Sequence, residues 1–321
     1  MTRPILQLKS VVYFLVGFVF FGGCQKTEPF SPSPVDPWKE VYTEFNYSVS
    51  DVVLDSSFGP FTQIGALENP ALKENSGLAA CTYRNDWLYG HNDGGDFNRF
   101  FVFDTSGKNI RYITVPGFSN RDCEDMGIDH SPIDGKKYMY LADFGDNNAV
   151  YPEIYIYRFA EPVLTSSDGD TSVPFAEKLT FVYPDGPRDA ETLLVDPWSH
   201  HLYIVTKREA KARVYKAEYP FVVPAGQSKI TLQKVAQLPF SGLVGGDISP
   251  DGRQILIKNY GQIFIWDRND GEPVTSALSK KPKVVPYKIE TQGEAVCWSN
   301  DSRKYYTVGE GKNAPVYVCG P

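Results

Sequence analysis

The chain has 321 residues, of which 42% are hydrophobic and 22% charged, and its formal net charge is −7. This composition excludes disordered, collagen-like and coiled-coil proteins. The negative charge argues against a nucleic acid polymer as a partner, because such partners require a basic surface. Aromatic residues make up 14% of the chain, and 27 Gly and 24 Pro residues interrupt it, which favours many short strands over helices.

The first residues predict an export signal. Arg3 and Lys9 precede an apolar run over residues 11–21, which is too short for a stable membrane anchor. The run ends in Phe21-Gly22-Gly23-Cys24, which resembles a bacterial lipoprotein signal. We therefore expect a signal peptide over residues 1–23, a lipid anchor on Cys24 and a tether over residues 24–45. The alternative is an ordinary signal peptide with an incidental cysteine. Gln25, by the same resemblance, favours the outer membrane of a Gram-negative bacterium.

A repeat of about 50 residues follows the tether. One strand pattern begins at residues 99, 153, 212, 262 and 315, and a second begins at residues 74, 124, 191, 244 and 294. In the first unit we expect strands over residues 76–82, 87–90, 100–104 and 110–115. Four-stranded units of this length are typical of propeller blades. The fifth unit lacks a last strand, which residues 61–67 would supply. The prediction is an all-β, five-bladed β-propeller over residues 46–321, closed by an N-terminal strand.

Acidic residues recur at the start of the innermost strands, beside the central channel. Carboxylates that converge on a narrow channel raise one another's pKa unless a cation compensates them. Hard oxygen ligands suit calcium better than zinc or copper. The predicted ligands of a channel calcium are Glu74, Glu124, Glu191, Asp247 and Glu294. The alternative is a water-filled channel in which Arg121 and Arg188 pair with the acids.

Further polar residues end the second strands, on the same face of the propeller. His91 or Asp93 could act as a general base there. Arg121, Arg188, Lys207 and Arg208 could neutralise a phosphate group. The other three histidines, His130, His200 and His201, are predicted on the opposite face. Cys81, Cys123, Cys297 and Cys319 could form disulfides in an exported protein, or remain buried thiols.

Two short stretches resemble a known family. Glu294-Ala-Val-Cys-Trp-Ser299 is similar to the last-blade motif of the calcium-activated nucleotidases of the secreted apyrase type. Leu88-Tyr89-Gly-His-Asn-Asp93-Gly94 resembles a second motif of that family. The resemblance implies a five-bladed propeller with glutamates around a channel calcium. The wider set of motifs also resembles exported bacterial propellers, a likeness that implies no function.

Two functions remain open at this point. The first is a monomeric, lipid-anchored propeller that binds a glycan or a surface protein, with Phe97, Phe144 and Tyr260 as stacking residues around the channel. The alternative is a calcium-dependent hydrolase of phosphate esters or anhydrides, acting on a small phosphorylated molecule. A glycosidase would need two opposed carboxylates, and the sequence singles out no such pair.

Overall fold

The structure is a computed structural model that describes residues 36, 38–165 and 167–321. The predicted signal peptide and Cys24 lie outside these residues. Within the described residues, no helix has the length and apolar character needed to cross a bilayer.

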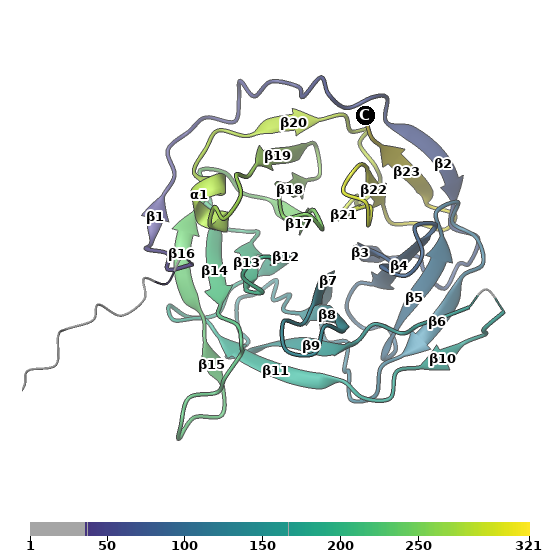
Figure 1. Ribbon diagram of the computed structural model, residues 1–321, viewed down its shortest axis with the longest axis horizontal. Coiled ribbons are helices and arrows are strands. Elements are labelled where there is room, and N and C mark those ends of the chain that lie inside the picture. Colours follow the sequence, from purple (N-terminus) through teal and green to yellow (C-terminus); the bar gives the residue numbers. More distant parts are fainter. Residues whose placement is uncertain (1–35, 37, 166) are drawn as a thin grey trace, which may run out of the picture. The chain divides into compact units, whose positions relative to one another are not determined.

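The strands form five sheets around a central axis (Figure 1). In blades 1 to 4 the innermost strand is the one that comes first in the chain, whereas blade 5 takes its outermost strand from an earlier part of the chain. Blade 1 contains β3 (Asn75–Ala80), β4 (Trp87–Asn92), β5 (Arg99–Asp104) and β6 (Arg111–Thr114). Blade 2 contains β7 (Cys123–His130), β8 (Lys137–Asp143), β9 (Ile154–Ala160) and β11 (Glu177–Val182). Blade 3 contains β12 (Ala190–Val195), β13 (Leu202–Thr206), β14 (Arg213–Ala217) and β16 (Gln233–Gln237).

The last two blades complete the ring. Blade 4 contains β17 (Leu243–Ile248), β18 (Gln254–Asn259), β19 (Ile263–Asp267) and β20 (Lys283–Val285). Blade 5 contains β21 (Ala295–Trp298), β22 (Tyr305–Val308), β23 (Pro315–Cys319) and, outermost, β2 (Thr62–Ala66), which pairs antiparallel with β23. The prediction of an all-β, five-bladed propeller is confirmed.

The propeller begins earlier in the chain than the expected boundary at residue 46. Strand β1 (Thr43–Glu44) runs parallel to β16 on the outer edge of blade 3. The carboxylate of Glu40 is buried, where it accepts hydrogen bonds from the Tyr203 hydroxyl at 2.9 Å and the Thr275 hydroxyl at 2.6 Å. Residues 40–45 are thus part of the folded unit, because a buried carboxylate needs such partners.

Other segments cover the outer edges of the blades in the same way. Strand β10 (Thr171–Ser172) runs parallel to β6, and β15 (Ile230–Thr231) runs parallel to β11. Leu54 makes a single parallel bridge to Val284 of β20. Covered edges leave fewer backbone groups free to pair with another chain.

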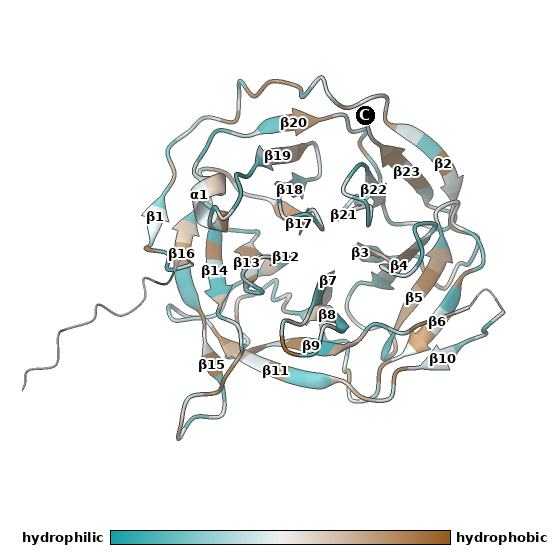
Figure 2. Cartoon of the chain, in the orientation of Figure 1, coloured by the Kyte–Doolittle hydropathy of each residue, from teal (hydrophilic) through white to brown (hydrophobic). Residues whose placement is uncertain are grey.

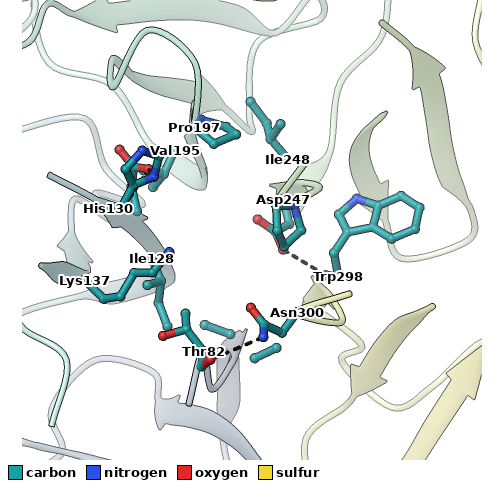
Figure 3. A pocket seen from close by; sticks show the side chains of 15 residues that line it. Thr82, Ile128, His130, Lys137, Val195, Pro197, Asp247, Ile248, Trp298 and Asn300 are labelled. Atoms are coloured by element: carbon teal, nitrogen blue, oxygen red, sulfur yellow. Dashed lines mark hydrogen bonds and ion pairs between the residues drawn. The ribbon is translucent and has the colours of Figure 1, made fainter. Parts of the chain in front are cut away.

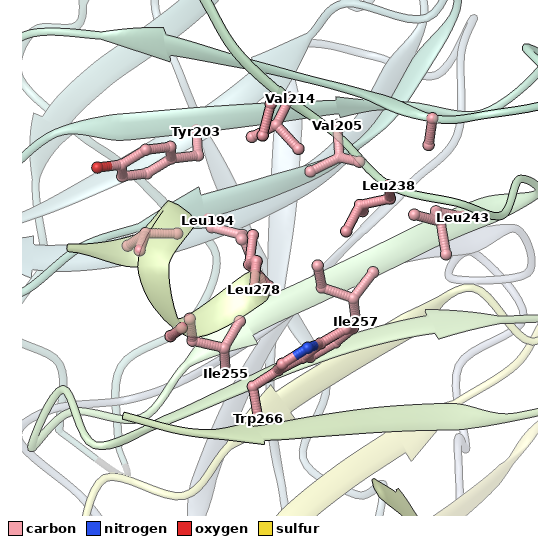
Figure 4. Packing of buried hydrophobic residues seen from close by; sticks show 14 of the residues in the cluster. Leu194, Tyr203, Val205, Val214, Leu238, Leu243, Ile255, Ile257, Trp266 and Leu278 are labelled. Carbon is pink, nitrogen blue, oxygen red and sulfur yellow. The ribbon is translucent and has the colours of Figure 1, made fainter. Parts of the chain in front are cut away.

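The hydrophobic core consists of five clusters, one between each pair of neighbouring blades in the described chain. Alternating residues of a strand point to opposite faces, so each blade contributes to two clusters. Figure 2 shows hydrophobic residues along strands such as β5 and β23. Figure 4 shows the cluster between blades 3 and 4, where Leu194 and Val205 face Ile257 and Trp266. The short helix α1 (Val274–Leu278) packs into this cluster through Leu278.

The four described cysteines are buried, and none of them forms a disulfide. Three of them have hydrogen-bond partners: the Tyr89 hydroxyl lies 3.2 Å from the Cys81 sulfur, Cys319 lies 3.2 Å from the Gly59 carbonyl oxygen, and the Cys123 sulfur lies 3.9 Å from a ring nitrogen of His91. Cysteines thus contribute to this fold as small buried side chains.

Candidate functional site at the channel mouth

A β-bulge near the start of the innermost strand places one residue of each of blades 1 to 4 around the channel. In blades 1 to 4 the pairing register shifts at this position, and in blade 5 the equivalent residue directly precedes β21. The residues at this level are Ser76, Glu124, Glu191, Val244 and Glu294. A bulge redirects a side chain relative to the regular ladder, and here it aims these residues at one end of the channel. We call this end the mouth.

Blade 1 therefore contributes Ser76, not the predicted ligand Glu74. The ladder pairs Gly77 with His91 in blade 1 and Asp125 with Ala142 in blade 2, which makes Ser76 the equivalent of Glu124. Glu74 lies two residues before that position, is partly exposed, and pairs with Lys73 at 3.0 Å. The sequence repeat that begins at residues 74 and 124 aligns Gly77 with Gly127 and therefore places Glu74 level with Glu124. Strand pairing instead makes Gly77 equivalent to Asp125, so Ser76 is level with Glu124.

Three buried glutamates meet at the mouth. Carboxylate oxygens of Glu124, Glu191 and Glu294 lie within 4.8 Å of one another, and each residue is at most 5% exposed. The hydroxyl oxygen of Ser76 lies 2.8 Å from the main-chain oxygen of Glu124 and 3.2 Å from Oε2 of Glu294. We call these three glutamates the carboxylate trio.

One ammonium group compensates part of this charge. Nζ of Lys207 forms an ion pair with Oε1 of Glu191 and lies 3.9 Å from Oε1 of Glu294. The Tyr260 hydroxyl donates to the same Glu294 oxygen at 2.6 Å. Oε2 of Glu191, however, is buried without a hydrogen-bond partner among the described residues. Such an atom is costly in a folded protein unless something else binds it.

The pKa values at the mouth reflect this shortage of positive charge. Burial, reinforced by Glu191, raises the pKa of Glu124 well above its usual range. Burial also raises the pKa of Glu191 to about 8, even though Lys207 acts in the opposite direction. Burial together with nearby carboxylates raises the pKa of Asp122 to about 6 and that of Glu310 to about 7. Perturbed carboxylates in a cavity are typical of functional sites.

The trio opens into a cavity of about 400 Å³. Besides the trio, this cavity is lined by Asp93, Asn147, Lys207, Arg208, Tyr260, Gln292 and Glu310. Asp93 and Asp122 also bring carboxylate oxygens within 4.8 Å of Glu124, which extends the acidic cluster along one wall. Of the predicted mouth residues, the structure thus brings Asp93, Lys207, Arg208 and Tyr260 together with the trio.

The two predicted phosphate-binding arginines Arg121 and Arg188 are engaged elsewhere. The Arg121 guanidinium lies over the Tyr151 ring at 4.0 Å and donates to the Glu153 carbonyl oxygen at 3.2 Å. Arg188 forms ion pairs with Asp185 and Glu209. Their backbones precede the innermost strands, as expected, but their side chains support the surrounding loops.

His91 does not reach the cavity either. Its ring is buried, and burial lowers its pKa. Nδ1 lies 2.9 Å from the Asn92 carbonyl oxygen, and Nε2 lies 3.9 Å from the Cys123 sulfur. A Cβ atom on Gly77 would lie only 2.2 Å from Nε2, so the ring fills the space beside this glycine. Phe144 is likewise buried, whereas Phe97 is exposed.

The predicted ligand Asp247 lies deeper in the channel, outside the carboxylate trio. Its Oδ2 accepts the N–H of Trp298 in blade 5 at 2.8 Å, and burial raises its pKa to about 7. Asp125 of blade 2 accepts the N–H of Leu193 in blade 3 in the same manner, also at 2.8 Å. These two aspartates connect the innermost strands of neighbouring blades, which is a structural role.

Comparisons with known proteins add nothing about function. No protein-family model and no curated protein matches the chain. Among solved structures, it is similar to the β-propeller domain of Cps50 (Swd1) from Myceliophteria thermophila, with 11% identity over 82% of this chain and 100% of that chain and a TM-score of 0.42. It is also similar to the Pan2 WD40 domain of Neurospora crassa, with 9% identity over 84% of this chain and 97% of that domain and a TM-score of 0.43. A third similar structure is the PQQ domain of pyranose dehydrogenase from Coprinopsis cinerea, with 10% identity over 88% of this chain and 100% of that domain and a TM-score of 0.45.

Proposed function

We propose that this protein is a binding propeller of the cell envelope, in which the carboxylate trio holds a calcium ion that helps to bind a ligand at the mouth. The observation that carries the proposal is the orphaned Oε2 of Glu191, buried within a trio of carboxylates. A divalent cation would satisfy this atom and neutralise the trio more fully than Lys207 alone.

The donor atoms favour calcium among the common metals. The trio and the Ser76 hydroxyl offer only oxygen, which is what hard cations prefer, and Ca²⁺ takes about six to eight such ligands. Lys207 would have to leave Glu191 when the cation binds. Its side chain is 15% exposed and borders the cavity, so its ammonium group has space into which to turn.

A binding role is favoured over phosphate hydrolysis. Of the two candidate bases only Asp93 lines the cavity, because His91 is enclosed, and two of the four candidate phosphate-binding residues, Arg121 and Arg188, are held by other partners. Oxygens of a glycan or of a protein side chain would complete the calcium coordination, while Arg208, Asn147 and Gln292 offer hydrogen bonds around it. The envelope location and the lipid anchor on Cys24 rest on the sequence of residues 1–25 alone.

A calcium titration of the melting temperature tests the ion. Metal-free protein should be stabilised by calcium, by about 2.7 kcal/mol when free calcium reaches 100 times the Kd. Glu191→Gln should lose most of this stabilisation, because an amide oxygen carries no charge. Glu74→Gln is the matched control, since Glu74 lies outside the trio. Equal losses in both variants, or no stabilisation of the wild type, would contradict a calcium site built by the trio.

Phosphate release separates binding from hydrolysis. Calcium-loaded protein incubated with a panel of nucleoside di- and triphosphates should release no phosphate above the level of Glu124→Gln. Turnover that this substitution abolishes would instead support the hydrolase.

A further inference from the structure

A second set of ligand-type side chains gathers at the opposite end of the propeller. Asp129 and His130 lie at the end of β7 in blade 2, and His200 lies in the turn between β12 and β13 in blade 3. Nδ1 of His200 is 2.6 Å from Oδ2 of Asp129, and Nδ1 of His130 is 3.2 Å from Oδ1. One carboxylate therefore faces two imidazoles, one from each of two blades.

The surroundings hold this group in place. The side chain of Asp129 is 3% exposed, and its Oδ1 also accepts the N–H of His130 at 2.7 Å. His200 has a φ of 61°, a backbone conformation that histidine adopts more readily than most residues. The two imidazole rings stand nearly perpendicular with centroids 5.0 Å apart, and the centroid of the Tyr219 ring lies 5.7 Å from that of His200.

We propose that Asp129, His130 and His200 bind a divalent transition-metal cation of the zinc type. A donor atom from each residue lies within 4.8 Å of the others, close enough for one ion to gather all three. Imidazole nitrogens select zinc, copper, nickel or iron over calcium, and two histidines with one carboxylate form a known type of ligand set. The site thus differs in metal class from the carboxylate trio at the mouth.

The geometry leaves coordination positions open. The side chain of His130 is 47% exposed, and Asp129 and His130 line a cavity of about 70 Å³. Figure 3 shows His130 and Lys137 on one side of this cavity, with Asp247, Trp298 and Asn300 on the other. Water or an external ligand can therefore reach a metal bound by these three residues.

The other two histidines are not available as ligands. His91 is enclosed between blades 1 and 2, and Nδ1 of His201 accepts the N–H of Tyr219 at 3.0 Å. Metal binding through histidine by the described residues must therefore use His130 and His200. Two single substitutions can test the proposal.

The experiment is a zinc titration of metal-free protein against a chromophoric chelator at pH 7.5. The wild type should bind one Zn²⁺ at this site, and His130→Ala and His200→Ala should each weaken it by roughly tenfold or more, since even loss of an outer partner costs that much. Because His130 is exposed, its variant should keep the wild-type melting temperature without zinc. Co²⁺ should give ligand-field absorption bands in the wild type that the His130→Ala variant loses.

Two control variants complete the design. Lys137→Ala borders the same cavity without being a ligand, and Glu191→Gln alters the trio at the mouth. Both should keep the zinc affinity of the wild type. The proposal is overturned if the wild type binds no zinc, if both histidine variants retain its affinity, or if Glu191→Gln loses as much affinity as His200→Ala.

Discussion

Strand β12 has a buried carboxylate at each end, and the two differ in how they are compensated. Asp196, just beyond its last residue, accepts two hydrogen bonds from the Arg268 guanidinium, at 2.6 and 3.0 Å, and a third from the Ser199 hydroxyl at 2.5 Å. Glu191, near its first residue, pairs with Lys207 through one oxygen, and its other oxygen has no hydrogen-bond partner in the part of the chain that the structure describes.

The difference separates an acid that needs no further partner from one that we propose as a cation ligand. Asp196 and Arg268 are both fully buried, and their bidentate pair satisfies the carboxylate completely, so it needs nothing further. Glu191 shares one ammonium group with Glu294 and borders the cavity at the mouth. Incomplete compensation next to a cavity is the arrangement that a bound cation would stabilise.

The largest expected effect on stability comes from breaking the ion pair between Asp196 and Arg268. Arg268→Leu should lower the free energy of unfolding by about 3–5 kcal/mol, because it leaves the Asp196 carboxylate buried and unpaired. Urea denaturation measures this change. Arg253→Leu is the matched control, since Arg253 is 59% exposed and pairs with the exposed Asp270. It should cost about 1 kcal/mol or less.

A double substitution tests whether the unpaired carboxylate of Asp196 causes this loss of stability. Asp196→Asn combined with Arg268→Leu should be more stable than Arg268→Leu alone, because no unpaired charge then remains. If the double variant is the less stable, the buried carboxylate is not the source of the loss.

The partly compensated Glu191 should make the stability of the metal-free protein depend on pH in an unusual direction. The pKa of Glu191 rises from 4.5 to about 8 on folding, so the folded state keeps a proton that the unfolded state has already released. Glu191 should therefore contribute a loss of stability of up to about 1.4 kcal/mol per pH unit as pH rises from about 4.5 to about 8, and Glu124 and Asp247, whose pKa values burial also raises, should add to this loss. Glu191→Gln should remove the Glu191 contribution and make the slope shallower. Calcium-induced stabilisation should grow over the same range, because calcium requires the ionised carboxylates.

Melting curves recorded in a chelator between pH 5 and 8 measure this dependence. Stability that rises with pH in the wild type, or an unchanged slope in Glu191→Gln, would mean that Lys207 already compensates the trio.

The sequence predicted the blades well because their strands alternate in hydrophobicity. The last repeat of that pattern, over residues 315–319, coincides with β23. The start of the folded unit could not be located in this way, because the burial of Glu40 depends on Tyr203 and Thr275, which are distant in sequence.

The site was predicted less completely, for geometric reasons. Glu124, Glu191 and Glu294 were expected at the channel, and the structure brings their carboxylates together. Ser76 was missed because the repeat aligned Gly77 with Gly127, whereas the ladder makes Gly77 equivalent to Asp125, a difference of two residues that strand pairing reveals and the motif does not. His91 was assigned to the correct end of its strand, but strand position alone does not reveal that its ring turns toward Cys123 and away from the cavity.

The smallest expected effect is a loss of calcium affinity on substitution of Ser76, and it tests whether Ser76 lies at the level of the carboxylate trio. Ser76→Ala should weaken calcium binding only about two- to tenfold, as expected for one neutral oxygen contact worth about 0.5–1.5 kcal/mol. Val244→Ala is the matched control, because Val244 holds the equivalent position in blade 4 and offers no ligand atom. Its calcium affinity, measured by calorimetry, should equal that of the wild type even if its stability is lower. Equal affinity losses at Ser76 and Val244 would indicate a general loosening of the ring, whereas a loss at Ser76 alone places its hydroxyl beside the ion.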